Sequence, residues 1–199
     1  MKDAIERFAD HIVETNFSDI PDRAIHSAKT FILDTLGVGL AGSTGPYVEE
    51  LLNAYSSASP AELTSRVLGQ RARINSADAA LINGFQIHNS EFDCVHEEAV
   101  IHTMTVLLAV LLADADRRGK INGIELLKSA ILGVDVACNL GVACTSGLQF
   151  FRPATAGAFA GVAAVGSVRG YDKEQLIRAF SLAYIQLSGT MQAHTEGSS

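Results

Sequence analysis

Apolar residues in this chain recur at spacings of three and four, which is the period of an α-helix. The first turns show the pattern, because Ile5, Phe8 and Ile12 would share one helix face. A capping box at Asn122–Glu125 starts another such segment, which extends to about residue 143. Further helices are expected from residue 22 into the glycine-spaced segment 37–42, and over about 46–56, 76–82, 103–118, 155–169 and 172–187. Hardly any stretch alternates with period two, so the sequence predicts an all-α, multi-helix domain over residues 1–199.

Composition narrows the classes of function. The 199 residues are 48% hydrophobic and carry a formal net charge of -7, which argues against a nucleic-acid surface because phosphate binding needs clustered Lys and Arg. The uncharged run 153–168 is too short for a membrane span, and the N-terminus lacks the apolar core of a signal peptide. Three cysteines with no CxxC pair favour a reducing compartment. We therefore expect a cytoplasmic protein without nucleic-acid or membrane partners.

Ionisable residues gather between two apolar, helix-like segments, within residues 88–102. They include two histidines, His88 and His102, and two acidic residues, Glu91 and Asp93, with His96 among them. Charges that are removed from water must be paired, neutralised or functional. A histidine can move a proton in either direction near neutral pH, and a neighbouring carboxylate can orient it. This segment is therefore the candidate site for acid–base chemistry.

Three other interpretations of the same segment are open. A divalent metal is one, but the histidine spacings match no zinc-helix pattern, so no metal ligands are expected. The sequence has no G-x-G-x-x-G after an expected strand and no Walker pattern, so no cofactor is expected either. A Cys94 nucleophile with His96 as its base is another, although residues so close in sequence rarely face each other as that chemistry requires. The third is structural, with His88 as a capping or core histidine and Asp93 bonded to loop backbone N–H groups.

Three segments, taken in order, resemble the MmgE/PrpD family, which includes 2-methylcitrate dehydratase, cis-aconitate decarboxylase and iminodisuccinate epimerase. The first is FILDTLGV at 31–38, which is similar to the family's early helix. The second joins ALING at 80–84 to the histidine at 88 and to EFDCVHE at 91–97, and is similar to the family pattern N-G…H-x-x-D-F-D-D-T-H-E. The third is ATAGAF at 154–159 with GYD at 170–172. Together they cover nearly the whole chain.

The resemblance implies a helical domain that carries most of an active site, forms a homodimer and precedes an α+β domain that this chain lacks. Residues 1–199 would then be an incomplete part of a longer two-domain protein. Family enzymes act on small di- and tricarboxylates by removing a proton beside a carboxylate, without a required metal or organic cofactor. The implied activity is that of a lyase, a 2-methylcitrate dehydratase-like hydro-lyase, with a small carboxylate as its partner.

The same resemblance implies roles for residues by their position. His102 would be the leading acid–base residue, Glu91 would stand where the family has its catalytic aspartate, and Asp93 would support the loop. Three further residues are expected to contact the substrate: His88, His96 and Arg152.

Departures from the family pattern keep other functions open. Val95 stands where the family has a threonine, and the family's second histidine has no counterpart in residues 150–153. Arg152 in that segment can clamp a carboxylate, but its pKa is too high for a base. The main alternative is a decayed, non-catalytic helical module for dimerisation or binding, and the other is an epimerase or decarboxylase of the same family. We also expect the 199-residue chain alone to be inactive or very weak, because its pocket would be open to water.

Overall fold

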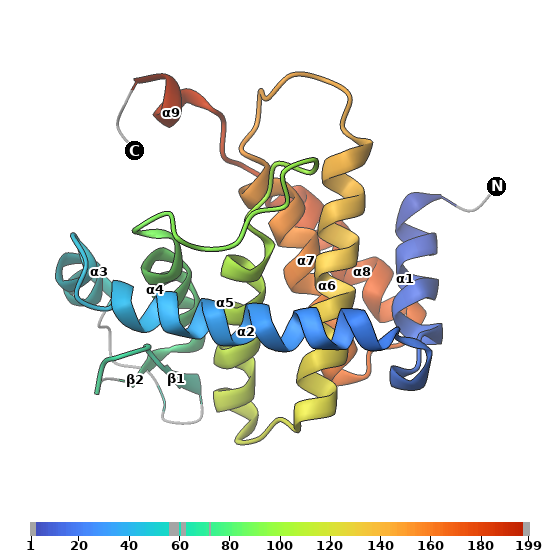
Figure 1. The fold of residues 1–199 in the computed structure, drawn as a ribbon, viewed down its shortest axis with the longest axis horizontal. Helices are drawn as coiled ribbons and strands as arrows, with labels where there is room; N and C mark the ends of the chain where they lie inside the picture. Colours follow the sequence, from blue (N-terminus) through green and yellow to red (C-terminus); the bar gives the residue numbers. More distant parts are fainter. Residues whose placement is uncertain (1–2, 56–59, 61–62, 72, 197–199) are drawn as a thin grey trace.

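Packed α-helices make up most of the computed structural model, which describes residues 3–196 except 56–59, 61–62 and 72 (Figure 1). The predicted all-α fold is confirmed. The helices are α1 (Ala4–Glu14), α2 (Asp22–Gly42), α3 (Val48–Tyr55), α4 (Ser76–His88), α5 (Thr103–Arg118), α6 (Gly123–Ala143), α7 (Arg152–Arg169), α8 (Lys173–Ile185) and α9 (Gln192–Glu196), with a 3-10 turn, η1, at Phe17–Asp19.

Local sequence signals place several helix ends correctly. Asn122 accepts a hydrogen bond from the backbone N–H of Glu125 at 2.8 Å, so the predicted capping box is present at the start of α6. Helix α5 has the expected span. Helix α7 begins at Arg152, three residues before the expected start, because Pro153 is tolerated in a first turn whose N–H groups have no partner within the helix.

Helix α5 lies in the middle of the fold and supplies much of its core. Three of its leucines, Leu107, Leu108 and Leu111, are at most 1% exposed. The helix packs against α4, α6 and α7, and α2 crosses the same bundle on one face (Figure 1). The first turn of α5 is therefore held rigidly at one end of the bundle, where the candidate site lies.

A close approach of α2 and α4 fixes the position of α4. A side chain at Gly42, the last residue of α2, would overlap the carbonyl oxygen of Gln86 on α4. Only glycine can occupy such a contact without moving the helices apart. Two residues later α4 ends at His88, so this contact helps to place the first histidine of the site.

A short β-hairpin is an element that the sequence did not predict. Strand β1 (Thr64–Arg66) pairs antiparallel with β2 (Arg73–Asn75), and Ser65 lies opposite Ile74. Strands of three residues are too short to display an alternating pattern.

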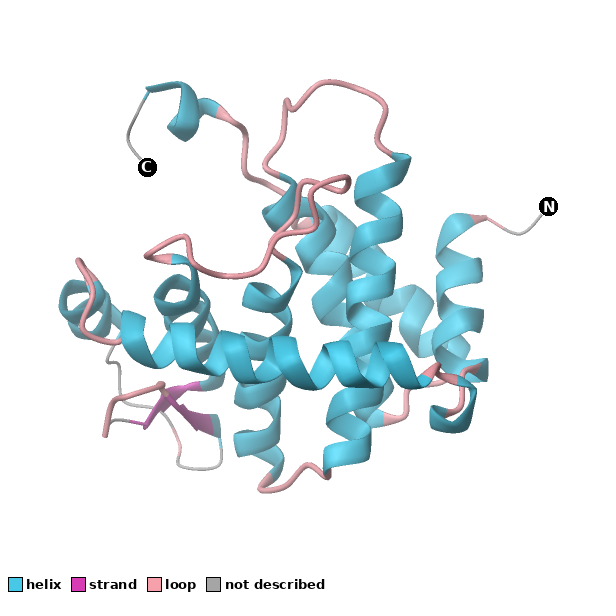
Figure 2. Cartoon of the chain, viewed as in Figure 1, coloured by secondary structure: helices cyan, strands magenta, loops and turns pink. Residues whose placement is uncertain are grey.

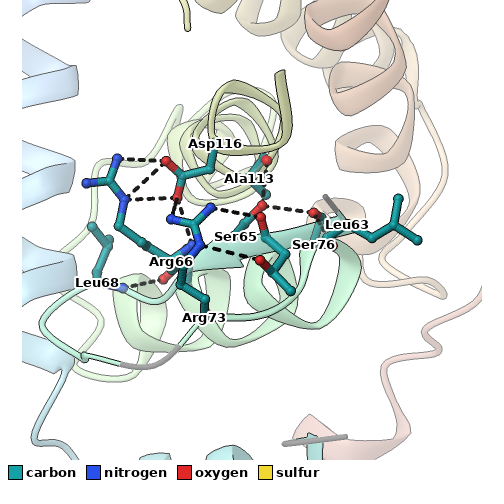
Figure 3. A network of polar contacts seen from close by, with 10 residues as sticks. Leu63, Ser65, Arg66, Leu68, Arg73, Ser76, Ala113 and Asp116 are labelled. Atoms are coloured by element: carbon teal, nitrogen blue, oxygen red, sulfur yellow. Dashed lines mark hydrogen bonds and ion pairs between the residues drawn. The ribbon is translucent and has the colours of Figure 1, made fainter. Parts of the chain in front are cut away.

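Polar contacts fasten this hairpin to the C-terminal part of α5 (Figure 3). Ser65 donates its hydroxyl to the carbonyl oxygen of Ala113 at 2.7 Å. Arg66 donates to the Asp116 carboxylate through its backbone N–H at 2.7 Å and through its guanidinium at 2.7 Å. These hydrogen bonds hold the pKa of Asp116 below its ordinary value. The hairpin is therefore tied to the same helix that carries the site at its other end.

Among the described helices, α6 is long and apolar enough to cross a membrane when judged by length and composition alone. It packs against α2, α5 and α7, and its residues Ala130, Leu132 and Val136 are at most 1% exposed. Part of its apolar surface thus belongs to the core of the fold.

Candidate active site

The ionisable residues of segment 88–102 lie at one end of the bundle, on the loop between α4 and α5. His88 is the last residue of α4 and His102 immediately precedes α5, so two helices fix the ends of the loop. Figure 2 shows that the loops after α4 and α6 and the segment before α9 lie on the same side of the bundle. Residues from these three segments, Val100, Leu148 and Met191, line one small cavity.

Two tight turns fold the loop back on itself. Glu91 and Val100 have left-handed backbone conformations, with φ of 52° and 53°. This conformation is unfavourable for a β-branched residue such as Val100, so the surrounding contacts must hold it in place. The backbone N–H of Glu91 donates to the carbonyl oxygen of His88 at 2.8 Å, and His96 and Ile101 form an antiparallel bridge. The fold-back brings Asp93 to both histidines.

Asp93 lies at the centre of the resulting cluster. Its side chain is 0% exposed, and Nδ1 of His88 lies 3.1 Å from its Oδ1 and 3.2 Å from its Oδ2. Nδ1 of His102 lies 3.1 Å from Oδ2, although off the line that a hydrogen bond requires. Thr105, in the first turn of α5, donates its hydroxyl to the same oxygen. The two imidazole rings meet edge to face, with their centroids 4.8 Å apart.

The charges of this cluster depend on one another. The hydrogen bond to Asp93 raises the pKa of His88 above its ordinary 6.5, against the opposing effect of burial. Burial alone would raise the pKa of Asp93, but hydrogen bonds from His88 and Thr105 hold it below its ordinary 3.8. Near neutral pH the cluster therefore pairs an ionised carboxylate with a histidine that is readily protonated.

The geometry leaves one nitrogen of each histidine for a reactant. The side chains of His88 and His102 are 32% and 25% exposed. Because Nδ1 of each ring faces Asp93, Nε2 is the nitrogen available to a ligand. A buried carboxylate in this position orients an imidazole and stabilises its protonated form. The arrangement is suited to removing a proton from a carbon atom or to supplying one.

The same three side chains could also hold a metal ion. The ligand atoms of His88, Asp93 and His102 lie within 4.8 Å of one another, and two imidazoles with one carboxylate are ligands that transition metals accept. Asp93 already accepts hydrogen bonds from His88 and Thr105, so a metal would have to displace protons from these contacts. The expectation that the site has no metal ligands stays a prediction.

Arg152 lines the small cavity beside the two histidines. This cavity has a volume of about 110 Å³. Its Nη1 donates to the carbonyl oxygen of Ala99 at 3.0 Å and its Nη2 to that of Cys144 at 3.4 Å. These bonds anchor the guanidinium between two loops and leave further N–H groups for an anion. The position fits the expected carboxylate clamp, whose role stays a prediction.

Two of the expected site residues lie apart from the cluster. Glu91 is exposed at the rim of the small cavity, and the carboxylate that contacts His102 belongs to Asp93. His96 accepts a hydrogen bond from the backbone N–H of Ala99 at 3.1 Å and lines a different cavity, which α1, α2 and α6 surround. The substrate contact expected of His96 therefore gains no support from its position.

Burial also bears on the interpretation of Cys94 as a nucleophile. It raises the pKa of the Cys94 thiol to about 11, and the charge of Asp93 adds to this effect. The reactive form of cysteine is the thiolate, which such a thiol hardly forms at neutral pH. The structure thus disfavours this interpretation.

Residues 6–199 match the family model of the MmgE/PrpD N-terminal domain. The chain belongs to the MmgE/PrpD family. It is 30% identical over 202 residues to the "Cis-aconitate decarboxylase-like protein oryM" of Aspergillus oryzae, which covers 94% of this chain and 40% of that protein. It is 30% identical over 191 residues to the cis-aconitate decarboxylase of Homo sapiens (92% and 39%) and 29% identical over 187 residues to that of Aspergillus terreus (90% and 38%). The chain thus spans about two fifths of the length of these curated relatives.

Thr105 is the member of the cluster in this MmgE/PrpD domain that the sequence did not reveal. It is 8% exposed and lies three residues after His102, which is one helical turn. A hydroxyl one turn after His102, at the start of the apolar part of the helix, is the signal that could have identified it.

Proposed function

We propose that this domain carries the acid–base centre of a lyase for a small di- or tricarboxylate, with cis-aconitate as the leading candidate substrate. The observation that supports the proposal is the buried carboxylate of Asp93 between two part-exposed histidines. In this proposal His102 transfers the proton, Asp93 orients its ring, and Arg152 binds a substrate carboxylate. The names of the relatives favour decarboxylation, and dehydration of the 2-methylcitrate type is the second candidate reaction.

Both reactions need one group that handles a proton at a carbon atom near a carboxylate. In the elimination of water, a neutral imidazole removes that proton. In the loss of CO₂, the bond electrons remain on the substrate, and a protonated imidazole supplies the proton that quenches them. A cation beside the carboxylate, here Arg152, stabilises the negative charge that either route develops.

The setting of the complete protein is also part of this proposal. The three cysteines include no CxxC pair, which favours a reducing compartment and supports a cytoplasmic location. The family resemblance supports a homodimer.

Turnover by the complete natural protein tests the proposal. Products from cis-aconitate and from 2-methylcitrate would be measured by proton NMR for the wild type, His102→Gln and Arg152→Lys. We expect His102→Gln to lower kcat by about 10²-fold or more, because it removes the proton-transfer group. Arg152→Lys should chiefly raise KM, because a lysine cannot bind a carboxylate in bidentate fashion.

His26→Gln is the matched control, because His26 is exposed on α2 and lines none of the cavities around the site. Full activity in His102→Gln would overturn the assigned role. A folded wild-type protein that turns over neither substrate would favour the non-catalytic module.

A further inference from the structure

The acid–base cluster adjoins two cavities of different character. The small one, of about 110 Å³, is lined by Arg152 and Glu91 among others. The second has a volume of about 520 Å³. Four residues line both cavities: His88, His102, Phe151 and Pro153. The two cavities are therefore neighbouring parts of one site, with both histidines at the junction.

The larger cavity is lined mainly by hydrocarbon. Its walls include Leu81 and Phe85 from α4, Val106 from α5 and Ala154 from α7. Apart from Asn89, its polar lining residues belong to the acid–base cluster: His88, His102 and Thr105. Among the described residues, no Asp, Glu, Lys or Arg lines it. Away from the two histidines, a carboxylate placed there would lose its hydration without a charged partner, whereas an alkyl group would gain from leaving water.

We propose that the larger cavity is a subsite for an apolar substituent, so that the preferred substrate is a polycarboxylate bearing an alkyl chain of several carbons. This inference rests on the proposed function and specifies its substrate class. The carboxylates of the substrate lie toward Arg152, its reacting carbon lies at His102, and its alkyl chain extends between α4, α5 and α7. Unsubstituted cis-aconitate leaves this apolar volume to water, which makes it the poorer ligand.

Binding of unreactive dicarboxylates to the complete natural protein tests the subsite. Titration calorimetry would compare succinate with 2-methylsuccinate, 2-butylsuccinate and 2-hexylsuccinate. Each methylene removed from water should lower Kd by up to about fourfold, since its burial is worth about 0.8 kcal/mol. The gain should accumulate along the series until the chain outgrows the cavity.

Two variants test whether the alkyl chain of the ligand lies in the larger cavity. Gly84 lines the larger cavity, and a Cβ at this position would meet only Ala109, at an ordinary 3.8 Å, so Gly84→Leu introduces an apolar side chain at the cavity wall without a clash at its Cβ. Leu81→Gln keeps the size of a side chain that is 45% exposed but makes it polar. Both should remove most of the gain with chain length. Gly37→Leu, on an open face of α2 where a Cβ meets nothing within 4 Å, is the matched control and should retain the gain.

Each outcome decides one part of the inference. Equal affinity of the wild type for succinate and 2-hexylsuccinate would overturn the subsite, while turnover of cis-aconitate that depends on His102 would leave the proposed function intact. A gain with chain length that survives both Gly84→Leu and Leu81→Gln would also overturn it, because the chain would then lie elsewhere. If no dicarboxylate binds and no turnover occurs, the proposed function fails together with the inference.

Discussion

Asp93 connects side chains that come from two helices and from the loop between them. Its carboxylate contacts His88 at the end of α4 and both His102 and Thr105 at the start of α5. A buried charge is tolerated only when such partners replace the water that it has lost. The same contacts that make Asp93 acceptable in the core therefore orient the two imidazoles for proton transfer.

We expect the His88–Asp93 pair to stabilise the fold most strongly between the ordinary pKa values of its two groups, 3.8 and 6.5. The folded pKa of His88 is raised, so its contribution is complete below 6.5 and is lost as the pH rises through the higher folded value. The folded pKa of Asp93 is lowered, so its contribution is present above 3.8 and is lost as the pH falls through the lower folded value.

Urea unfolding of the wild type and of Asp93→Asn measures this effect. The difference in free energy of unfolding should be larger at about pH 5.5 than at about pH 9. Asp135→Asn is a control, because the exposed Asp135 pairs with the half-buried His11 away from the His88–Asp93 pair. A difference for Asp93→Asn that stays constant or grows with pH would contradict the assigned pairing.

Helices and their contacts show which parts of the structure a sequence can reveal. The capping box at Asn122 and the span of α5 follow from local signals, because a cap and an apolar face are built from residues close in sequence. The contact between Asp93 and Thr105 follows from no such signal. It depends on the left-handed turns at Glu91 and Val100 and on the helix packing that sets α4 beside α5. The residue types of the site were therefore predictable, whereas the choice of Asp93 over Glu91 as the contact of His102 was not.

Two glycine substitutions test the packing of these helices. Gly42→Ala should lower the free energy of unfolding by about 1–3 kcal/mol, because the added methyl overlaps the carbonyl oxygen of Gln86. Gly161→Ala should instead raise it by up to about 1 kcal/mol, because alanine favours the helix and the nearest atom, on Val110, is 3.8 Å from the new Cβ. Denaturant titrations of both variants measure the sign of the change in the free energy of unfolding. Stabilisation by Gly42→Ala would contradict the close approach of α2 and α4.

At the scale of the whole molecule, the acid–base cluster, Arg152 and two cavities lie together within one MmgE/PrpD N-terminal domain. It spans about 40% of the length of the oryM relative. In this chain about a third of the His88 side chain and a quarter of the His102 side chain are exposed to solvent. Water in contact with the imidazoles weakens the electrostatic interactions on which catalysis depends.

We therefore expect the 199-residue chain to turn over a carboxylate at least about 10²-fold more slowly than the complete natural protein, from the loss of water exclusion and of substrate positioning. Initial rates with cis-aconitate at equal molar concentrations of both proteins provide the comparison, and circular dichroism confirms that both are helical. Equal kcat values would show that the 199-residue chain alone excludes water and positions the substrate well enough for catalysis.

Solvent deuterium in the product tests the role of the cluster most directly. The complete natural protein would be incubated with cis-aconitate in heavy water, and the product examined by proton and deuterium NMR. We predict one carbon-bound deuterium from the solvent in each product molecule, with product formation lost in His102→Gln and strongly reduced in Asp93→Asn. A product without solvent deuterium, or an undiminished rate in His102→Gln, would contradict proton transfer by this cluster.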